Sequence, residues 1–237
     1  MLSHATLSKA GGRPNNEDCV GVWESGGRVL FALADGLGGH GGGEIASSLA
    51  VSKAMEAFEA GAKLAQCFLL GQNALIDEQR RRGTPGEIKT TLVLLLADDD
   101  IVHWGHIGDS RLYVFDKSKF VSRTKDHSVP QMLLNAGDIR ERDIRFHPDR
   151  NRLLRVMGIE WDTPRYELSE PCPLESGTSY LLCTDGFWEL IDEKDMCRAL
   201  KAAQNPQEWL DDMEDTVLRN GRGKSMDNYS AVAVWIR

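Results

Sequence analysis

The sequence lacks the features that mark secreted and membrane-spanning proteins. Its five cysteines are odd in number and contain no CxxC pair, which predicts buried thiols in a reduced protein. The first residues carry no basic flank followed by an apolar stretch, so we expect no signal peptide. The longest apolar run, Leu92–Ala97, is too short to cross a bilayer. We therefore expect a cytoplasmic protein without a membrane partner.

The chain also lacks an excess of positive charge. The chain has 28 Lys and Arg against 36 Asp and Glu, a formal net charge of −8, so it carries no footprint of a nucleic-acid partner. Its 237 residues are 41% hydrophobic, which is enough for a sizeable core. Because no linker or change in composition divides the chain, we expect a single domain over residues 1–237.

The hydrophobic pattern predicts an α+β domain. Runs typical of strands occupy residues 28–34, 90–97, 101–106, 111–115, 120–123, 179–184 and 229–236. Helical patterns occupy residues 44–59, 62–82, 128–135, 193–203 and 206–220. Short strands joined by tight turns favour antiparallel sheets, and long helices are expected to pack outside them.

Five acidic residues are spread across the chain, and four of them end an apolar run or open a glycine-rich turn. They are Asp18, Asp35, Asp109, Asp185 and Asp227. Carboxylates that meet at one rim of the core would repel one another unless cations lay between them, and hard divalent cations take oxygen ligands. The pattern predicts a metal-dependent hydrolase site assembled from the whole domain.

Two shorter motifs suggest other chemistry. Residues 36–41 match GxGxxG between a strand and a helix, as in dinucleotide-binding proteins, but Asp35 would repel a pyrophosphate and a second helix follows instead of a strand. Asp98 and Asp100 match the nucleophile and acid of an aspartyl-phosphate enzyme. The strand expected directly after them favours a solvated hairpin turn.

Several motifs occur in a fixed order along the chain. They are RPNNED at 13–18, DGLGGH at 35–40, GEIAS at 43–47, TT at 90–91, GDSR at 108–111, DHS at 126–128, RVMG at 155–158, TDG at 184–186 and DN at 227–228. Each is weak alone, but together they resemble the PPM family of metal-dependent protein serine/threonine phosphatases in its compact bacterial form. The thiolate loop of cysteine phosphatases is absent, because no cysteine is followed six positions later by arginine.

The resemblance implies a four-layer α-β-β-α sandwich, two antiparallel sheets flanked by helix pairs, with the metals in a cleft at one end. It also implies a metal set of two Mn²⁺ or Mg²⁺ ions with a possible third. Asp35 would bridge the first two ions. Asp185 and Asp227 would complete one of them, and Glu17 with the carbonyl of Gly36 the other.

The resemblance also implies roles for residues around the metals. Asp109 would help hold the third ion, and Asp18 would orient metal-bound water. Arg13 would clamp the substrate phosphate, because its planar fork of donors is always charged. His40 would protonate the leaving group or order its loop, and a metal-bound water is the alternative acid. His127 is expected to be a hydrogen-bonded structural residue.

The predicted function is hydrolysis of phosphoserine and phosphothreonine on proteins by a metal-bridging hydroxide, which reverses a serine/threonine kinase, with a Hanks-type kinase and its targets as partners in a bacterial host. The alternative is a catalytically silent regulator of the same fold that binds phosphoprotein; it is disfavoured because every carboxylate expected to bind metal is present. The family's flap corresponds to residues 137–162, where six arginines are interleaved with Asp138, Glu141, Asp143 and Asp149. These arginines are expected either to contact acidic or phosphorylated protein or to form a salt-bridged surface.

Overall fold

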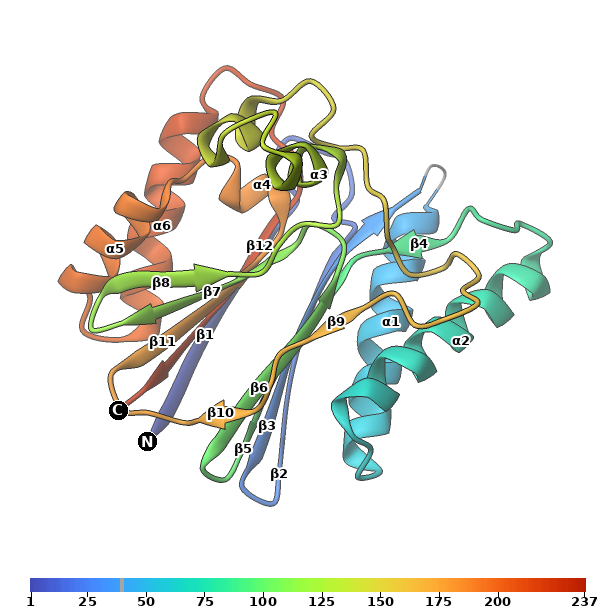
Figure 1. Ribbon diagram of the computed structural model, residues 1–237, viewed down its shortest axis with the longest axis horizontal. Helices are drawn as coiled ribbons and strands as arrows, with labels where there is room; N and C mark the ends of the chain where they lie inside the picture. Colours follow the sequence, from blue (N-terminus) through green and yellow to red (C-terminus); the bar gives the residue numbers. More distant parts are fainter. Residues whose placement is uncertain (39–40) are drawn as a thin grey trace.

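The computed structural model describes residues 1–38 and 41–237, which form four layers (Figure 1). Two β-sheets lie face to face, and helices cover both outer sides. The first half of the chain contains β1 (Leu2–Lys9), β2 (Asp18–Ser25), β3 (Arg28–Leu37), α1 (Gly42–Glu59), α2 (Leu64–Arg82), β4 (Lys89–Thr90), β5 (Leu92–Asp98), β6 (Ile101–Ile107), β7 (Arg111–Asp116) and β8 (Lys119–Arg123). The second half contains α3 (Val129–Ala136), the 3-10 helix η1 (Glu141–Phe146), β9 (Glu167–Leu168), β10 (Cys172–Pro173), β11 (Thr178–Cys183), α4 (Asp185–Trp188), α5 (Glu193–Ala202), α6 (Pro206–Gly221) and β12 (Tyr229–Ile236).

Both sheets are antiparallel throughout the described strands. The first sheet has the order β1-β12-β11-β7-β8, and the second has the order β10-β6-β5-β3-β2, with β9 beside β6 and β4 beside β3. The two ends of the chain meet in the first sheet, where Leu2 lies opposite Ile236 (Figure 1). The predicted α-β-β-α sandwich is confirmed. The antiparallel pairing also excludes the βαβ unit that a dinucleotide-binding reading of residues 36–41 requires.

Strand β3 shows why the apolar runs are continuous. Leu30 and Ala32 face the helices, whereas Phe31 and Leu33 face the other sheet, and all four side chains are fully buried. Side chains alternate between the faces of a strand, so a strand with both faces covered is apolar at every position. The layer between the sheets is filled by the side chains of Phe31, Leu33, Val93, Leu95, Leu112, Leu182, Val232 and Val234.

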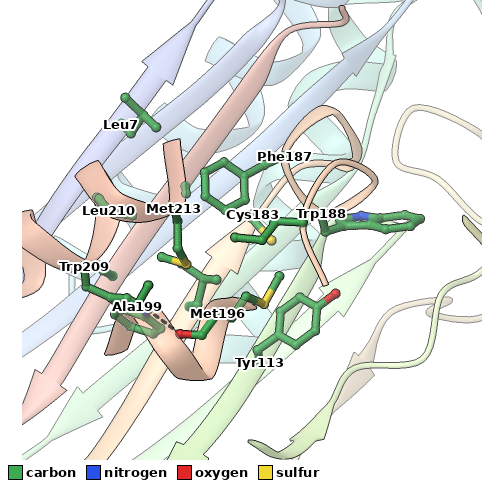
Figure 2. Close-up of a cluster of buried hydrophobic side chains, with 14 of the residues drawn as sticks. Leu7, Tyr113, Cys183, Phe187, Trp188, Met196, Ala199, Trp209, Leu210 and Met213 are labelled. Carbon is green, nitrogen blue, oxygen red and sulfur yellow. Dashed lines mark hydrogen bonds between the residues drawn. The ribbon is translucent and has the colours of Figure 1, made fainter. Parts of the chain in front are cut away.

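Each outer face of the sandwich is covered by a helix pair. On the second sheet, α1 places Ala46, Ala50, Ala54 and Ala57 against the strands, and all four are buried. On the first sheet, α5 and α6 pack through larger side chains, including Met196 and Trp209 (Figure 2). The indole Nε1 of Trp209 donates to the carbonyl of Met196 at 3.1 Å, so the polar atom of this buried ring is satisfied.

Most predicted elements are found within a few residues of their expected ends, but β1, β2, η1, β9, β10 and the short α4 were not predicted. Strand β1 buries only Ala5 and Leu7, because it lies at the edge of its sheet. Strand β3 continues past Asp35 to Leu37, since Gly36 pairs with Thr90 of β4. The predicted hairpin turn at residues 98–100 is confirmed, and Asp98 forms an ion pair with Arg28 at 3.0 Å. Among the described helices, none combines the length and the apolar character needed to cross a bilayer.

Candidate metal centre

A cleft of ≈ 680 Å³ collects the predicted site residues at one end of the two sheets. Its lining includes the side chains or backbone of Arg13, Glu17, Asp35, Gly36, Asp109, Asp185 and Asp227, together with Asn15, Gly38, Gly41, Asn151 and Asn228. Asp18 is buried beside it, opposite Asp35 in the pairing of β2 with β3. His40 lies outside the described residues, so its predicted role stays a prediction.

Two glycines permit the backbone to close around the cleft. A Cβ atom on Gly36 would lie 2.1 Å from the carbonyl oxygen of Gly43, and the amide of Gly36 donates to the carbonyl of Glu17 at 3.1 Å. A Cβ atom on Gly186 would lie 2.0 Å from the carbonyl oxygen of Asn228. No other residue fits at either position, because contacts below 3.0 Å with backbone atoms would displace the chain.

The backbone of Asp35 is held by Thr90, the last residue of β4, and by Thr91, which links β4 to β5. Its amide donates to Thr91 Oγ1 at 2.9 Å, and its carbonyl accepts from the Thr91 amide at 2.9 Å and from Thr90 Oγ1 at 2.7 Å. These bonds satisfy the peptide groups of Asp35 on both sides. Its carboxylate is therefore free to face the cleft without a competing backbone partner.

Asn228 ties the first loop of the chain to the last strand. Its Oδ1 accepts from the amide of Glu17 at 2.8 Å, and its Nδ2 donates to the carbonyls of Ala10 at 2.9 Å and Asn15 at 2.8 Å. Its own amide donates to Asp227 Oδ1 at 2.9 Å. The side chain and the backbone amide of Asn228 thus hold Glu17 and Asp227, which are 210 positions apart in the sequence, beside the same cleft.

Burial and mutual repulsion make the carboxylates of the cleft difficult to ionise. The pKa values of Asp35 and Asp185 are raised well above the ordinary value by burial first, and then by the neighbouring charges of Asp185 and Asp109, respectively. Burial also raises the pKa of Asp18 to about 7, although Thr184 and Ser230 oppose the shift. The pKa of Asp109 is raised to about 7 by burial and then by the charge of Asp126.

This donor set fits hard divalent cations. It offers several carboxylates and the carbonyl of Gly36 on one cleft, which is the oxygen chemistry that Mg²⁺ and Mn²⁺ prefer. Asp18 Oδ1 is buried and finds no hydrogen-bond partner among the described residues, whereas its Oδ2 accepts from Thr184 Oγ1 at 3.0 Å. A buried, unpartnered carboxylate oxygen is costly unless a cation or an ordered water satisfies it.

A second group of metal-capable side chains lies outside the cleft. The ligand atoms of His106, His127 and Glu167 are within 4.8 Å of one another, and this trio is the one such compact group found in residues 1–38 and 41–237. The predicted carboxylates line the cleft but do not form so tight a group.

The histidine trio is built as a hydrogen-bonded support. His127 Nδ1 accepts from the amide of Gly108 at 3.1 Å, so its Nε2 carries the proton and donates to Glu167 Oε1 at 3.1 Å. Arg155 lies 3.1 Å from the same Glu167 oxygen, where it would repel a metal ion. Burial, and then His106, lowers the pKa of His127 to about 4. The structural role expected for His127 agrees with this arrangement, which holds the turn that carries Asp109.

Two residues in or beside the cleft were not found from the sequence. Asn151 lines both the cleft and a neighbouring cavity of ≈ 440 Å³, and Glu189 lines only that neighbouring cavity, from the segment after α4. Glu189 forms an ion pair with Arg150 at 2.9 Å, while burial raises its pKa. Neither residue lies in a motif or at the end of an apolar run, so no local signal indicates them.

The arginines of residues 137–162 are largely engaged in ion pairs. Arg145 pairs with Glu193 at 2.8 Å, Arg150 with Glu189 at 2.9 Å and Arg155 with Glu167 at 3.1 Å. Arg152 pairs with Asp149 at 3.3 Å, and Arg142 lies 3.8 Å from Asp143. Five of the six arginines in residues 137–162 therefore form ion pairs with residues that the structure describes, as in a salt-bridged surface, and the ion pair of Arg142 is the longest of the five.

Comparison with known proteins gives consistent matches. A sequence profile described as Protein phosphatase 2C matches residues 8–228. The serine/threonine protein phosphatase PstP of Mycobacterium tuberculosis is 32% identical over 208 residues, which are 85% of this chain and 39% of PstP. The chain thus spans less than half the length of that relative. The serine/threonine phosphatase Stp of Listeria welshimeri is 30% identical over 211 residues, 84% of this chain and 82% of Stp.

A solved structure extends the comparison to the fold and to a metal. The catalytic domain of PstP in complex with two manganese ions superposes with a TM-score of 0.83 at 27% identity, covering 100% of this chain and 99% of that domain.

Proposed function

The chain belongs to the protein phosphatase 2C family, and from this membership we propose that it is a metal-dependent protein phosphatase acting on phosphoserine and phosphothreonine. One observation carries the proposal: carboxylates from both sheets converge with Arg13 on a single cleft. Such a cleft suits a dianionic phosphate ester only when cations offset its negative charge. Phosphatase relatives that match most of this chain support the same activity.

The proposed metal ligands are the residues whose charges repel one another in the cleft. Asp35 is the central ligand, with Asp185 and Asp227 on one side and Glu17 with the Gly36 carbonyl on the other. Asp109 is proposed to serve a third ion. The two manganese ions bound by the PstP catalytic domain support Mn²⁺ as the first ion to test, with Mg²⁺ as the alternative. Bound divalent cations supply Lewis-acid activation of a water nucleophile and neutralise charge on the phosphoryl group.

The surrounding residues then orient the reactants. Arg13 lies half-exposed on the rim, where its guanidinium can donate two hydrogen bonds to phosphate oxygens. Asp18 Oδ1, which lacks a partner among the described residues, can accept a hydrogen bond from the attacking water and so orient it. His40 is proposed either to order its loop or to protonate the leaving alkoxide, with a metal-bound water as the alternative acid.

The proposed substrates are phosphorylated proteins, and the proposed partner is a Hanks-type kinase whose targets the enzyme dephosphorylates in a bacterial cytoplasm. The named relatives are phosphatases of bacteria, which supports this setting. A catalytically silent phosphoprotein-binding regulator is not favoured by any observation, since each carboxylate expected to bind metal is present.

The test is hydrolysis of a phosphothreonine peptide with Mn²⁺, with EDTA, and after Mn²⁺ is added back. We expect turnover that EDTA abolishes and Mn²⁺ restores. Asp185→Asn should remove turnover, whereas Asp98→Asn, a matched change in the distant hairpin turn, should leave it intact. Turnover that survives EDTA and Asp185→Asn but is lost in Asp98→Asn would contradict the proposal and revive the aspartyl-phosphate mechanism.

A further inference from the structure

A second groove, of ≈ 900 Å³, lies between strand β8, helices α3 and η1, and the start of α5. Its walls include the apolar side chains of Phe120, Val121, Leu134, Ile144 and Phe146. Three of them are largely in contact with solvent: Phe120 is 41% exposed, Val121 58% and Phe146 82%. Large apolar side chains gathered on an open groove mark an interaction site more often than a chance surface.

The groove is continuous with the acidic cleft. A cavity of ≈ 440 Å³ lies between them. It shares Arg145 and Phe146 with the apolar groove, and it shares Arg13, Asp185 and Asp227 with the cleft. A chain segment that enters the cleft with one residue can therefore lie along Phe146 and continue into the groove.

Strand β8 gives the groove an open side. It ends the first sheet, and among the described strands its partner is β7 alone. The residues from Lys119 to Ser122 are all exposed. An edge strand with exposed apolar side chains is a favourable surface for an extended peptide.

The charges around the groove favour an acidic occupant. Three carboxylates line the groove: Glu141 and Glu193 already pair with Arg123 at 2.5 Å and Arg145 at 2.8 Å, respectively, and Asp192 caps α5 by accepting from the amide of Asp195 at 2.8 Å. By contrast, Lys125 and Lys194 line the groove without an ion pair to any residue in the described part of the chain. Arg142 is only loosely held, as described above. The protein has a net charge of −8, so these unpaired cations are a local exception to its overall negative charge.

We propose that this groove binds the segment of the phosphoprotein substrate that flanks the phosphorylated residue, as an extended stretch with a bulky apolar side chain and one or more acidic residues. The proposal rests on the proposed function, because it takes the acidic cleft as the place where the phosphate lies. Apolar contacts come from Val121 and Phe146, and the acidic residues of the substrate pair with Lys125 and Lys194. The groove therefore selects among phosphoproteins without taking part in the chemistry.

The test compares three substrates with Mn²⁺ present: p-nitrophenyl phosphate, a phosphothreonine peptide of about five residues, and peptides of about fifteen residues, roughly 50 Å when extended. The long peptides carry Leu, Phe and Glu on the N-terminal or the C-terminal side of the phosphothreonine. We expect one long peptide to have a lower KM than the short one. Lys125→Glu with Lys194→Glu should raise that KM about three- to tenfold and leave kcat on p-nitrophenyl phosphate unchanged.

Matched controls separate docking from damage to the fold. Lys201→Glu makes the same charge change on an exposed lysine at the other end of α5, away from the groove. Val121→Asp tests the apolar wall, and Leu218→Asp repeats that change on a 43% exposed residue of α6. The controls should match the wild type on every substrate.

Equal KM values for short and long peptides in wild type and variants would overturn the docking proposal while leaving the phosphatase intact. A dimer that sedimentation detects in the wild type and that Val121→Asp dissociates would also overturn it, because a second copy would then occupy the groove. If the wild type fails to hydrolyse p-nitrophenyl phosphate in the presence of Mn²⁺, that result would instead count against the proposed function.

Discussion

Arg13 Nη2 donates to Asp227 Oδ2 at 2.8 Å, so the arginine proposed to hold phosphate is paired with a carboxylate proposed to hold metal. The two side chains are 53% and 43% exposed, and a pair so open to water contributes little to stability. A cation at Asp227 would compete with the guanidinium for the carboxylate. Metal binding would thereby release Arg13 toward the substrate phosphate.

This relationship predicts the effect of Arg13→Ala. We expect kcat/KM for a phosphothreonine peptide to fall about ten- to hundredfold, because a charge-assisted pair of hydrogen bonds to phosphate is lost. The melting temperature should change little. Arg13→Lys keeps the charge but loses the planar fork, so it should restore only part of the activity. Full activity in Arg13→Ala, measured by steady-state kinetics, would remove Arg13 from the site.

Asp35→Asn should stabilise the metal-free protein and at the same time abolish its stabilisation by Mn²⁺. Asp35 is the most crowded carboxylate of the cleft, since the charges of Asp185, Asp18, Asp109 and Asp227 all raise its pKa after burial has done so. A neutral amide removes that repulsion, so the EDTA-treated variant should melt at a higher temperature than the EDTA-treated wild type. Mn²⁺ should raise the melting temperature of the wild type and not that of the variant. A variant that Mn²⁺ stabilises as strongly as the wild type would refute the central role of Asp35.

The metal-free protein should lose stability as the pH rises through neutrality. Asp109 has a folded-state pKa of about 7, above its ordinary value near 4 in an unfolded chain. Its contribution to stability is therefore fully present below about pH 4 and is lost as the pH rises through about 7. In EDTA, the melting temperature of the wild type minus that of Asp109→Asn should fall between about pH 5 and about pH 8.

Metal affinity should change over the same pH range. Because cations bind the deprotonated carboxylates, Mn²⁺ affinity should rise over this pH range with release of protons. Calorimetric titrations in buffers of different ionisation enthalpy measure that release. A difference in melting temperature that grows with pH, or Mn²⁺ binding without proton release, would contradict the raised pKa values of Asp18 and Asp109.

The sequence predicted the parts of the site that local physics specifies. Asp35 and Asp185 follow apolar runs and precede glycines, a combination that places a carboxylate at the rim of a core beside a tight turn. A Cβ atom on Gly36 or Gly186 would lie within 2.1 Å of a backbone carbonyl oxygen, so the place of these glycines in the motifs has a steric cause. The sandwich itself followed from the resemblance to a known family and from strands joined by short turns.

What the sequence did not predict depends on distant contacts. Strand β1 exists because it pairs with β12 over residues more than 200 positions apart, and its own pattern buries only two side chains. Glu189 reaches the cavity beside the cleft from the segment after α4. Val121 and Phe146 are residue types that usually lie in a core, and only the arrangement of β8 and η1 leaves them exposed. Local propensity contains no information on any of these.

The most direct test of the account is the position of bound manganese. A crystal of the protein grown with Mn²⁺ and measured at the manganese absorption edge should show two anomalous peaks beside Asp35. One peak should contact Asp185 and Asp227, and the other should contact Glu17 and the Gly36 carbonyl. Peaks at His106, His127 and Glu167 with none in the acidic cleft would contradict the assignment of the metal centre and the function built on it.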